Sequence, residues 1–181
     1  MKNSRSQLLF LSIFLLSTIA GAAQKVLIGG QPGTRLLEWS DFKGVPNESS
    51  PYYAYTAWKT NVKFGSVSFD GEKAIISGFE MTVEFDDKKS WVKKGKETDE
   101  LLKHEQGHFD VGLLYMQEVL RSFAGVSFTR SAYKEEFRQF IEGIHKKYAA
   151  MGKLYDQETS HSIKKDEQAK WNNFFDENVK R

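Results

Sequence analysis

Residues 101–110 read LLKHEQGHFD, and this stretch contains two histidines four positions apart. His104 is the first, His108 is the second, and Glu105 directly follows the first. On an α-helix, residues four apart stand one turn above each other on the same face. The spacing therefore predicts a helix that directs both imidazole rings towards one position, with the carboxylate of Glu105 beside it.

This arrangement is typical of residues that bind a zinc ion. Neutral imidazole nitrogens bind Zn²⁺ at about 2.0–2.1 Å, and a catalytic zinc site uses three protein ligands and leaves one position for water. The ion lowers the pKa of that water to about 7, and a neighbouring carboxylate can accept its proton. We therefore expect one Zn²⁺ ion bound by His104 and His108, with Glu105 as the general base.

A histidine pair that simply packs in the core is the alternative interpretation. It does not explain Glu105, because burying a carboxylate without a compensating partner costs several kcal/mol. The surrounding sequence predicts burial, since apolar residues follow two faces of the helix. One face contains Leu102, Phe109, Leu113, Met116, Leu120 and Phe123, and the other contains Leu101, Val111, Tyr115 and Val119. A helix of this kind lies between two layers.

The ends of this helix and its polar residues give further indications. Thr98 is a suitable N-cap, so the helix should cover about residues 99–124. Gly112 costs about 1 kcal/mol relative to alanine in a helix, which indicates that another segment approaches there. Gln106 and Asp110 fall near the core-facing side and need hydrogen-bond partners, either in the sheet or around a histidine.

Residues 1–23 have the pattern of a secretory signal peptide, with a basic start, an apolar stretch and a small-residue cleavage site. The mature chain, residues 24–181, has the length of one domain. The apolar stretch is short for a membrane span, and an uncleaved anchor is the alternative. We therefore expect a secreted or periplasmic protein without a membrane span in its mature chain.

Charge and cysteine content exclude several classes of function. Lys2 and Arg5 lie in the predicted signal peptide, and without them the chain has as many basic as acidic residues. A neutral domain gives no reason to expect nucleic acid or an anionic membrane as a partner. The sequence contains no cysteine, which excludes disulfides, thiol catalysis and cysteine-bound zinc.

The N-terminal half of the mature chain is expected to be rich in β-strands. We expect a short strand at 35–39 and a longer one at 54–64, where apolar and polar side chains alternate. Asp70-Gly71 predicts a hairpin turn, and residues 79–85 alternate strictly. These segments predict a sheet of three or four largely antiparallel strands.

Two further helices are predicted downstream. Apolar residues at helical spacing mark one from Tyr133 to Met151, with Gly152 as its stop, and another covers about residues 165–179. The expected fold class is therefore α+β. A small, mostly antiparallel sheet packs on the helix that carries the histidine pair, and two further helices complete the domain.

A catalytic zinc site needs a third ligand from elsewhere in the chain. The candidates are His161, His145, Glu158 and Asp156. His145 lies beside the apolar face of the second helix and is expected to be exposed or to support another ligand. His161 ends the expected irregular segment 153–161, and loops on a rigid scaffold often carry ligands. His161 is therefore favoured, with Glu158 and Asp156 as alternatives.

The sequence resembles a bacterial family of unknown function whose members are described as predicted secreted zinc-dependent proteases. The resemblance rests on residues 102–110, LKHEQGHFD, and on residues 155–161, YDQETSH. Weaker similarity is found at residues 37–42, LEWSDF, and at Ser90-Trp91. The similarity covers nearly the whole of the mature chain.

This resemblance implies a zincin-like fold and a peptidase activity. It implies His104, His108 and His161 as the zinc ligands and Glu105 as the base. The family pattern has a glycine after the last histidine, where this chain has Ser162.

The sequence therefore predicts a secreted zinc metallopeptidase that hydrolyses peptide bonds in a peptide or protein substrate. Tyr155 is a candidate for stabilising the oxyanion that develops during hydrolysis, a role worth about 3 kcal/mol. Its alternative role is to pack in the core and bond a main-chain carbonyl. Three other functions stay open: a non-catalytic zinc-binding envelope protein, a metal-free adhesion domain, and an amidase that cleaves peptidoglycan peptides.

Overall fold

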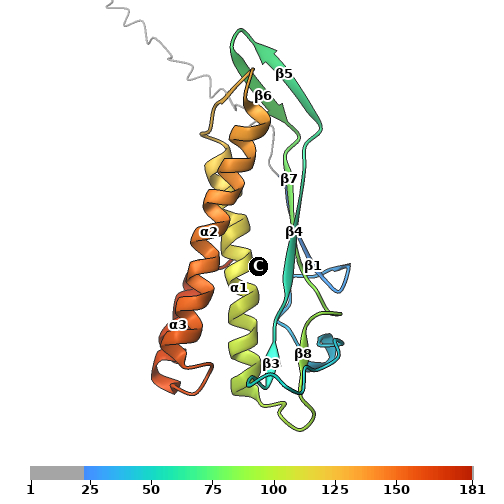
Figure 1. Ribbon diagram of the computed structural model, residues 1–181, viewed down its shortest axis with the longest axis vertical. Helices are drawn as coiled ribbons and strands as arrows, with labels where there is room; N and C mark the ends of the chain where they lie inside the picture. The colour runs from blue at the N-terminus through green and yellow to red at the C-terminus, as the bar shows by residue number, and fades with distance from the viewer. Residues whose placement is uncertain (1–22, 181) are drawn as a thin grey trace, which may run out of the picture.

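The computed structural model describes residues 23–180 and shows three layers (Figure 1). A β-sheet forms one side, helix α1 (Asp99–Phe123) lies in the middle, and helices α2 (Tyr133–Thr159) and α3 (Lys165–Asn178) cover the other side. This arrangement confirms the predicted α+β fold class. The sheet packs on the helix that carries both histidines, and two further helices follow it along the chain.

Helix α1 begins and ends within one residue of the predicted limits. The main-chain N–H of Leu101 donates a hydrogen bond of 3.2 Å to the hydroxyl of Thr98, which is the predicted N-cap. Asp99 and Glu100 in the first turn suit the positive end of the helix.

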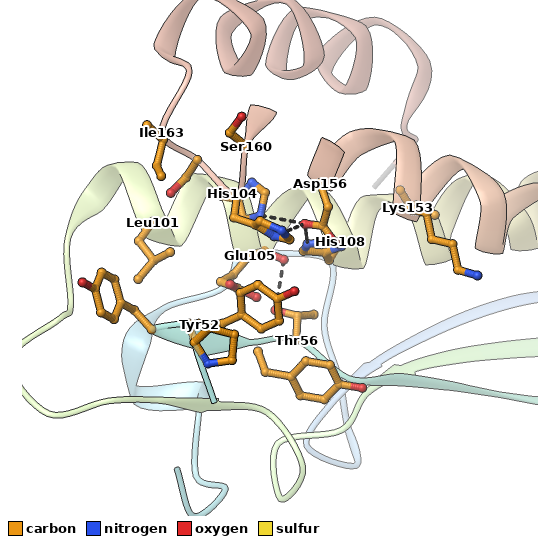
Figure 2. Close-up of a pocket in the computed structure, with 18 of the residues that line it drawn as sticks. Tyr52, Thr56, Leu101, His104, Glu105, His108, Lys153, Asp156, Ser160 and Ile163 are labelled. Carbon is orange, nitrogen blue, oxygen red and sulfur yellow. Dashed lines mark hydrogen bonds and ion pairs between the residues drawn. The ribbon is translucent and has the colours of Figure 1, made fainter. Parts of the chain in front are cut away.

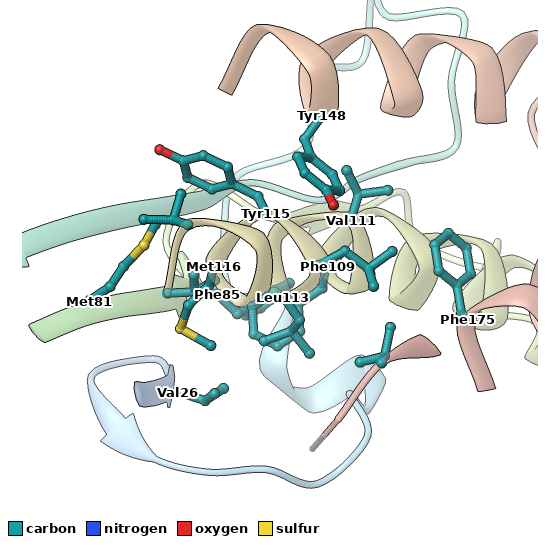
Figure 3. Close-up of a cluster of buried hydrophobic side chains, with 14 of the residues drawn as sticks. Val26, Met81, Phe85, Phe109, Val111, Leu113, Tyr115, Met116, Tyr148 and Phe175 are labelled. Atoms are coloured by element: carbon teal, nitrogen blue, oxygen red, sulfur yellow. The ribbon is translucent and has the colours of Figure 1, made fainter. Parts of the chain in front are cut away.

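The hydrophobic core lies on both sides of α1 (Figure 3). On the sheet side, the ring centroids of Phe85 and Phe109 are 5.7 Å apart. On the side of the other helices, the rings of Tyr155 and Phe175 are 5.5 Å apart. The strict alternation predicted at 79–85 is confirmed, since the fully buried residues of this strand are Met81, Val83 and Phe85.

The main sheet has four strands in the order β2-β1-β7-β4. Their bounds are Ala23–Ile28 for β1, Gln31–Pro32 for β2, Trp58–Lys63 for β4 and Glu80–Phe85 for β7. β1 pairs with β2, and β7 with β4, in antiparallel fashion, whereas β1 and β7 are parallel. The sheet therefore has the predicted number of strands and mostly antiparallel pairing. Two of its strands, β1 and β2, were not predicted, and the strands predicted on either side of Asp70-Gly71 belong to another sheet.

The predicted hairpin at Asp70-Gly71 is confirmed. It joins β5 (Ser66–Asp70) to β6 (Lys73–Ser77), and the positive φ of Gly71, 53°, suits the tight turn. A short strand, β9 (Phe128–Thr129), pairs with β6 and completes a second sheet. This sheet stands at one end of the molecule, near the start of α2 (Figure 1).

The single strand predicted at 54–64 is interrupted. Its first part, β3 (Ala54–Tyr55), pairs with β8 (Trp91–Val92), whereas β4 belongs to the main sheet. Between them, the N–H of Ala57 donates to the hydroxyl of Ser90 at 2.9 Å, and its carbonyl accepts from the same hydroxyl at 3.3 Å. The carbonyl of Ala57 also accepts a main-chain hydrogen bond of 2.9 Å from Asp86, so only its N–H depends on a side chain. The chain passes from one sheet to the other at this residue.

The prediction of a strand at residues 35–39 is wrong, because the structure has no strand there. A short 3-10 helix, η1 (Trp39–Asp41), follows here, and hydrogen bonds between side chains and main chain close its first turn. The N–H of Leu37 donates to the side-chain oxygen of Gln106 at 2.7 Å. Because side chains rather than a neighbouring strand satisfy this main chain, no strand forms.

Helix α2 is longer than predicted. The sequence predicted a stop at Gly152, but the helix continues to Thr159. Most of the segment 153–161, expected to be irregular, is therefore helical. The additional turns bury Tyr155 and Thr159 completely, so tertiary packing outweighs the low helix propensity of one glycine. The third predicted helix is confirmed as α3.

The predicted signal peptide lies outside the described residues apart from its last position, Ala23. Ala23 is the first residue of β1 and lies opposite Glu80 of β7. Within residues 23–180, no helix is both long enough and apolar enough to cross a membrane.

Gly112 confirms that another segment approaches α1, because a Cβ atom at this position would lie 2.8 Å from Cδ2 of Trp58. Gly112→Ala should therefore lower the free energy of unfolding by about 1–3 kcal/mol through overpacking. Guanidinium unfolding measures the change. Gly143→Ala in α2 is the matched control, because nothing lies within 4 Å of its Cβ position. It should stabilise by about 0.5–1 kcal/mol, and equal effects of both substitutions would contradict this packing.

Candidate metal centre

Side chains from three parts of the chain meet beside α1 (Figure 2). His104 and His108 extend from α1, Asp156 extends from the last turn of α2, and His161 lies in the turn that follows. One oxygen of Asp156, Oδ1, lies 3.2 Å from His104 Nε2, 3.0 Å from His108 Nε2 and 3.1 Å from His161 Nδ1. The fold therefore brings together the three histidines singled out in the sequence and places Asp156 between them.

The geometry of three of these side chains fits a metal ion. Single ligand atoms of His104, His108 and Asp156 all lie within 4.8 Å of one another. Ligands held tetrahedrally at about 2.0–2.1 Å from zinc lie about 3.3–3.4 Å apart. The observed separations between Asp156 Oδ1 and the two Nε2 atoms, 3.2 and 3.0 Å, are close to that value. Two imidazoles and a carboxylate are also a common donor set of catalytic zinc.

The turn after α2 brings His161 back towards the cluster. Ser160, His161 and Ser162 have φ angles of 47°, 53° and 74°, in the left-handed region that favours glycine. The N–H of His161 donates to the carbonyl of Asp156 at 3.0 Å, which closes the helix end. Such strained residues concentrate at functional sites.

Glu105 is buried beside the cluster and is only 4% exposed. Among the described residues, its Oε2 atom has no hydrogen-bond partner. A buried polar atom without a partner costs free energy, and such atoms often mark a site completed by water or a ligand. The main-chain carbonyl of Glu105 accepts a hydrogen bond of 3.1 Å from Thr56, which ties α1 to the segment between β3 and β4 (Figure 2).

Burial and charge act in opposite directions on this cluster. Burial tends to raise the pKa of Asp156, but hydrogen bonds from His104 and His108, together with their charge, hold its pKa well below its usual range. Burial tends to lower the pKa of His108, but the hydrogen bond to Asp156 and the charge of Glu105 raise its pKa above 6.5. The metal-free protein therefore favours a carboxylate paired with an imidazolium.

A chain of hydrogen bonds holds His104 from the side away from Asp156. His104 Nδ1 lies 3.0 Å from Gln168 Oε1, and Gln168 Nε2 donates to the hydroxyl of Tyr155 at 2.7 Å. That hydroxyl donates in turn to the main-chain carbonyl of His104 at 3.1 Å. All three side chains are buried. Gln168 was not predicted, because a single glutamine on an amphipathic helix forms no recognisable motif.

Tyr155 lies behind the histidines and is completely buried. Its ring stacks on that of His104 with a centroid distance of 4.7 Å. Burial raises the pKa of its hydroxyl well above the usual range. The bond to a main-chain carbonyl is the packing role that the sequence left open for this residue. Gly107 allows the contact, because a Cβ atom there would lie 2.7 Å from Tyr155 Cζ.

The cluster lines an open cleft of about 760 Å³. One wall is formed by residues of the segment 51–58, and the other by α2 and the turn that follows it. The ring of Tyr52 lies across the cleft from α2 and contacts that of His161, with centroids 4.5 Å apart. Apolar and aromatic side chains contribute much of the lining, among them Ala54, Trp58, Leu101, Val111, Tyr148 and Ile163.

Two other candidate ligands lie in different surroundings. His145 is exposed on α2, which is one of the two positions predicted for it, and its ring contacts those of Trp58 and Tyr115. Glu158 is also exposed, and its carboxylate accepts a hydrogen bond of 2.8 Å from the indole of Trp171. Neither residue belongs to the group of potential ligands found among residues 23–180.

Gln106 and Asp110 have the hydrogen-bond partners that their position required. Gln106 accepts from the N–H of Leu37 at 2.7 Å and donates to Asp110 Oδ1 at 2.8 Å. These bonds tie α1 to the segment before η1 rather than to a strand. The expected need for hydrogen-bond partners is confirmed, but the partner of Gln106 on another segment, Leu37, lies neither in the sheet nor at a histidine.

The fold and the site define an α+β domain with a candidate metal centre in a cleft. Residues 27–162, most of the chain, match the family described as Bacterial protein of unknown function (DUF922), and the chain belongs to this family. The resemblance to a bacterial family of unknown function is thereby confirmed, while the peptidase description of its members stays a prediction. Searches of curated proteins and of solved structures find no match.

The opposite pKa shifts predict how Asp156→Asn changes stability with pH in the metal-free protein. Because the pKa of Asp156 is lowered on folding, its carboxylate stabilises the fold at pH values above 3.8, its pKa in the unfolded chain, and this stabilisation is lost on acidification. Because the pKa of His108 is raised on folding, its imidazolium stabilises the fold at pH values below 6.5, its pKa in the unfolded chain, and this stabilisation is lost as the pH rises through the pKa of the folded state. The substitution should therefore cost about 1–2 kcal/mol more at about pH 5.5 than at about pH 9.

Guanidinium unfolding in the presence of a chelator measures this difference. Asp176→Asn is the control, because Asp176 is exposed on α3. A cost of Asp156→Asn that is the same at both pH values would contradict the charged pair.

Proposed function

We propose that this protein is a zinc-dependent metallopeptidase. The observation that carries the proposal is the position of Glu105. Its Oε2 atom is buried and has no hydrogen-bond partner among residues 23–180, and Glu105 lines the same cleft as the three residues whose ligand atoms lie within 4.8 Å of one another. A closed structural zinc site uses four protein ligands and has no need of such a carboxylate. Three ligands and an adjacent base are what metal-assisted hydrolysis uses.

In this proposal His104, His108 and Asp156 hold the ion. Asp156 is chosen as the third ligand because its Oδ1 contacts both imidazoles of α1. His161 was the ligand favoured from the sequence. Its Nδ1 contacts the same oxygen at 3.1 Å, which suits a residue that orients Asp156.

The chain's own residues supply the proton transfers. When bound, a zinc ion supplies a Lewis acid that acidifies a water molecule and polarises a carbonyl. Glu105 accepts a proton from the attacking water at Oε2 and delivers it to the amide nitrogen of the leaving group. Tyr155 has no part in these transfers, since its hydroxyl is buried and bonded to the main chain of His104.

The cleft suits an extended peptide as the substrate. Residues of β3 line it, and among the described strands β3 pairs only with β8. Its other edge can therefore form main-chain hydrogen bonds with an added strand. The apolar and aromatic lining favours apolar side chains in that peptide.

We also propose that the protein acts outside the cytoplasm. The support is the signal-peptide pattern of residues 1–23. Both partners that the sequence suggested, a protein and a cell-wall peptide, are compatible with this location.

Glu105→Gln should bind zinc with the stoichiometry of the parent protein and lose at least about 100-fold in peptide hydrolysis, because the amide cannot accept the proton. Elemental analysis gives the zinc content, and a peptide-library cleavage assay gives the activity. Glu100→Gln is the matched control, since Glu100 is an exposed glutamate in the first turn of the same helix. Full activity in Glu105→Gln would remove Glu105 as the base.

Asp156→Ala and His161→Ala distinguish the two possible third ligands. Loss of a direct ligand should lower zinc affinity by more than about 100-fold, whereas loss of a residue that orients a ligand costs about 10-fold to 100-fold. Asp156→Ala should therefore have the larger effect in a competition titration with a chromophoric chelator. His145→Ala, an exposed histidine on α2, serves as the control. A larger loss in His161→Ala would assign the third position to His161.

A further inference from the structure

We infer that Gln168, on the C-terminal helix α3, is a positioning residue that fixes the tautomer of His104 and thereby directs its Nε2 atom to the metal. The inference rests on the proposed metal site but not on hydrolysis. Gln168 is 7% exposed and lies outside the residues 27–162 that match the family. It contacts the ring of His104 from the side opposite Asp156, with 3.0 Å between its Oε1 and Nδ1.

The direction of the hydrogen bonds follows from one main-chain atom. The carbonyl oxygen of His104 can only accept, so the hydroxyl of Tyr155, 3.1 Å away, must donate its single proton there. The hydroxyl can then only accept from Gln168, whose side-chain nitrogen lies 2.7 Å from it. The amide oxygen of Gln168 is thereby left facing His104 Nδ1. An oxygen at this position requires a proton on Nδ1.

The reversed amide orientation is unfavourable. It would place the side-chain oxygen of Gln168 2.7 Å from the hydroxyl of Tyr155, whose proton is already used, and 2.8 Å from the side-chain oxygen of Asn172. In the observed orientation Gln168 donates both of its amide protons, one to Tyr155 and one to Asn172. The reversed orientation would require the Asn172 amide to turn as well and Tyr155 to give up its bond to the main chain of His104, whereas the observed one keeps all of these bonds.

A proton fixed on Nδ1 has a consequence for the other nitrogen of the ring. In the neutral imidazole only one nitrogen carries a proton, so Nε2 keeps its lone pair. Nε2 is the atom that lies 3.2 Å from Asp156 Oδ1, at the proposed ion position. Asp156 Oδ1 competes for the single proton of the neutral ring through Nε2, and a proton on Nε2 blocks the metal-binding atom. The amide oxygen of Gln168 shifts this competition towards Nδ1 and so favours the form of His104 that can bind the metal.

Helix α3 is held rigidly enough to perform this role. Phe175 of α3 packs on Tyr155 and approaches Gly107, where a Cβ atom would lie 2.9 Å from its ring. Gly107 lies between the two histidines of α1. The same close packing of three helices therefore sets the distance between Gln168 and His104.

The tautomer of His104 can be measured without a metal. In ¹⁵N-labelled, metal-free protein at alkaline pH, two-bond ¹H–¹⁵N correlation spectra separate the two neutral tautomers of each ring. The chain has four histidines, so single substitutions assign the signals. Because Asp156 competes for this proton, the spectra are recorded in the Asp156→Ala background, where we expect the Nδ1–H form for His104. Gln168→Met, which is similar in size but lacks the acceptor, should shift the ring towards the Nε2–H form.

Zinc affinity provides the second measurement. Gln168→Met should bind zinc about 10-fold to 100-fold more weakly in a chelator competition. Gln168→Glu keeps an oxygen next to Nδ1 and should retain both the parent tautomer and the greater part of the affinity. Asn172→Ala removes the other bond of the same amide and should change the affinity far less than Gln168→Met. A purely structural role would not separate the Met and Glu variants in this way.

Each outcome decides the matter. An Nε2–H tautomer in Asp156→Ala, or unchanged tautomer and affinity on adding Gln168→Met, would overturn the inference. If Gln168→Met does not fold, the tautomer of His104 in Asp156→Ala, with Gln168 and with Gln168→Glu, still decides it. A protein that binds no zinc refutes the proposed function and leaves the tautomer result standing. Zinc binding without hydrolysis refutes only the peptidase activity.

Discussion

Three imidazole rings converge on one carboxylate oxygen, Asp156 Oδ1, at 3.0–3.2 Å, and this convergence depends on the close packing of the helices. Asp156 reaches the histidine pair only because α2 runs alongside α1 and extends past Gly152. The contact also requires Gly107, since a side chain there would collide with Tyr155. The close approach of the helices and the polar cluster are therefore two aspects of one packing arrangement.

The helix that carries the histidines is held by polar contacts as well as by its apolar faces. Thr56 donates to the main-chain carbonyl of Glu105, and Gln106 accepts from the N–H of Leu37. Both partners, Thr56 and Leu37, lie in segments that connect other elements, and their bonds fix the position of α1 along its axis. Neither bond involves the carboxylate of Glu105, whose Oε2 atom has no hydrogen-bond partner among the described residues. A buried oxygen without a partner lowers the stability of the fold, and such atoms are common at sites that water or a ligand completes.

Local patterns in the sequence predicted the parts of the fold that local physics determines. The capped, two-faced helix α1, the alternation of β7 and the turn at Asp70-Gly71 all follow from periodicity and turn chemistry. The errors occurred where distant residues decide the local structure. Leu37 pairs with a glutamine 69 positions away instead of with a strand, and α2 passes Gly152 because Tyr155 is buried. The histidine pair was recognisable from its spacing, whereas Gln168 is defined only by a contact across 64 positions.

The position of Gln168 has a practical consequence for how this domain is delimited. A fragment cut at the end of the family match, Ser162, would contain every residue proposed to bind the ion and the proposed base. It would lack the amide behind His104 and the ring of Phe175 that covers Gly107. A domain boundary drawn around the proposed ligands alone would therefore remove the residues of α3 that orient His104.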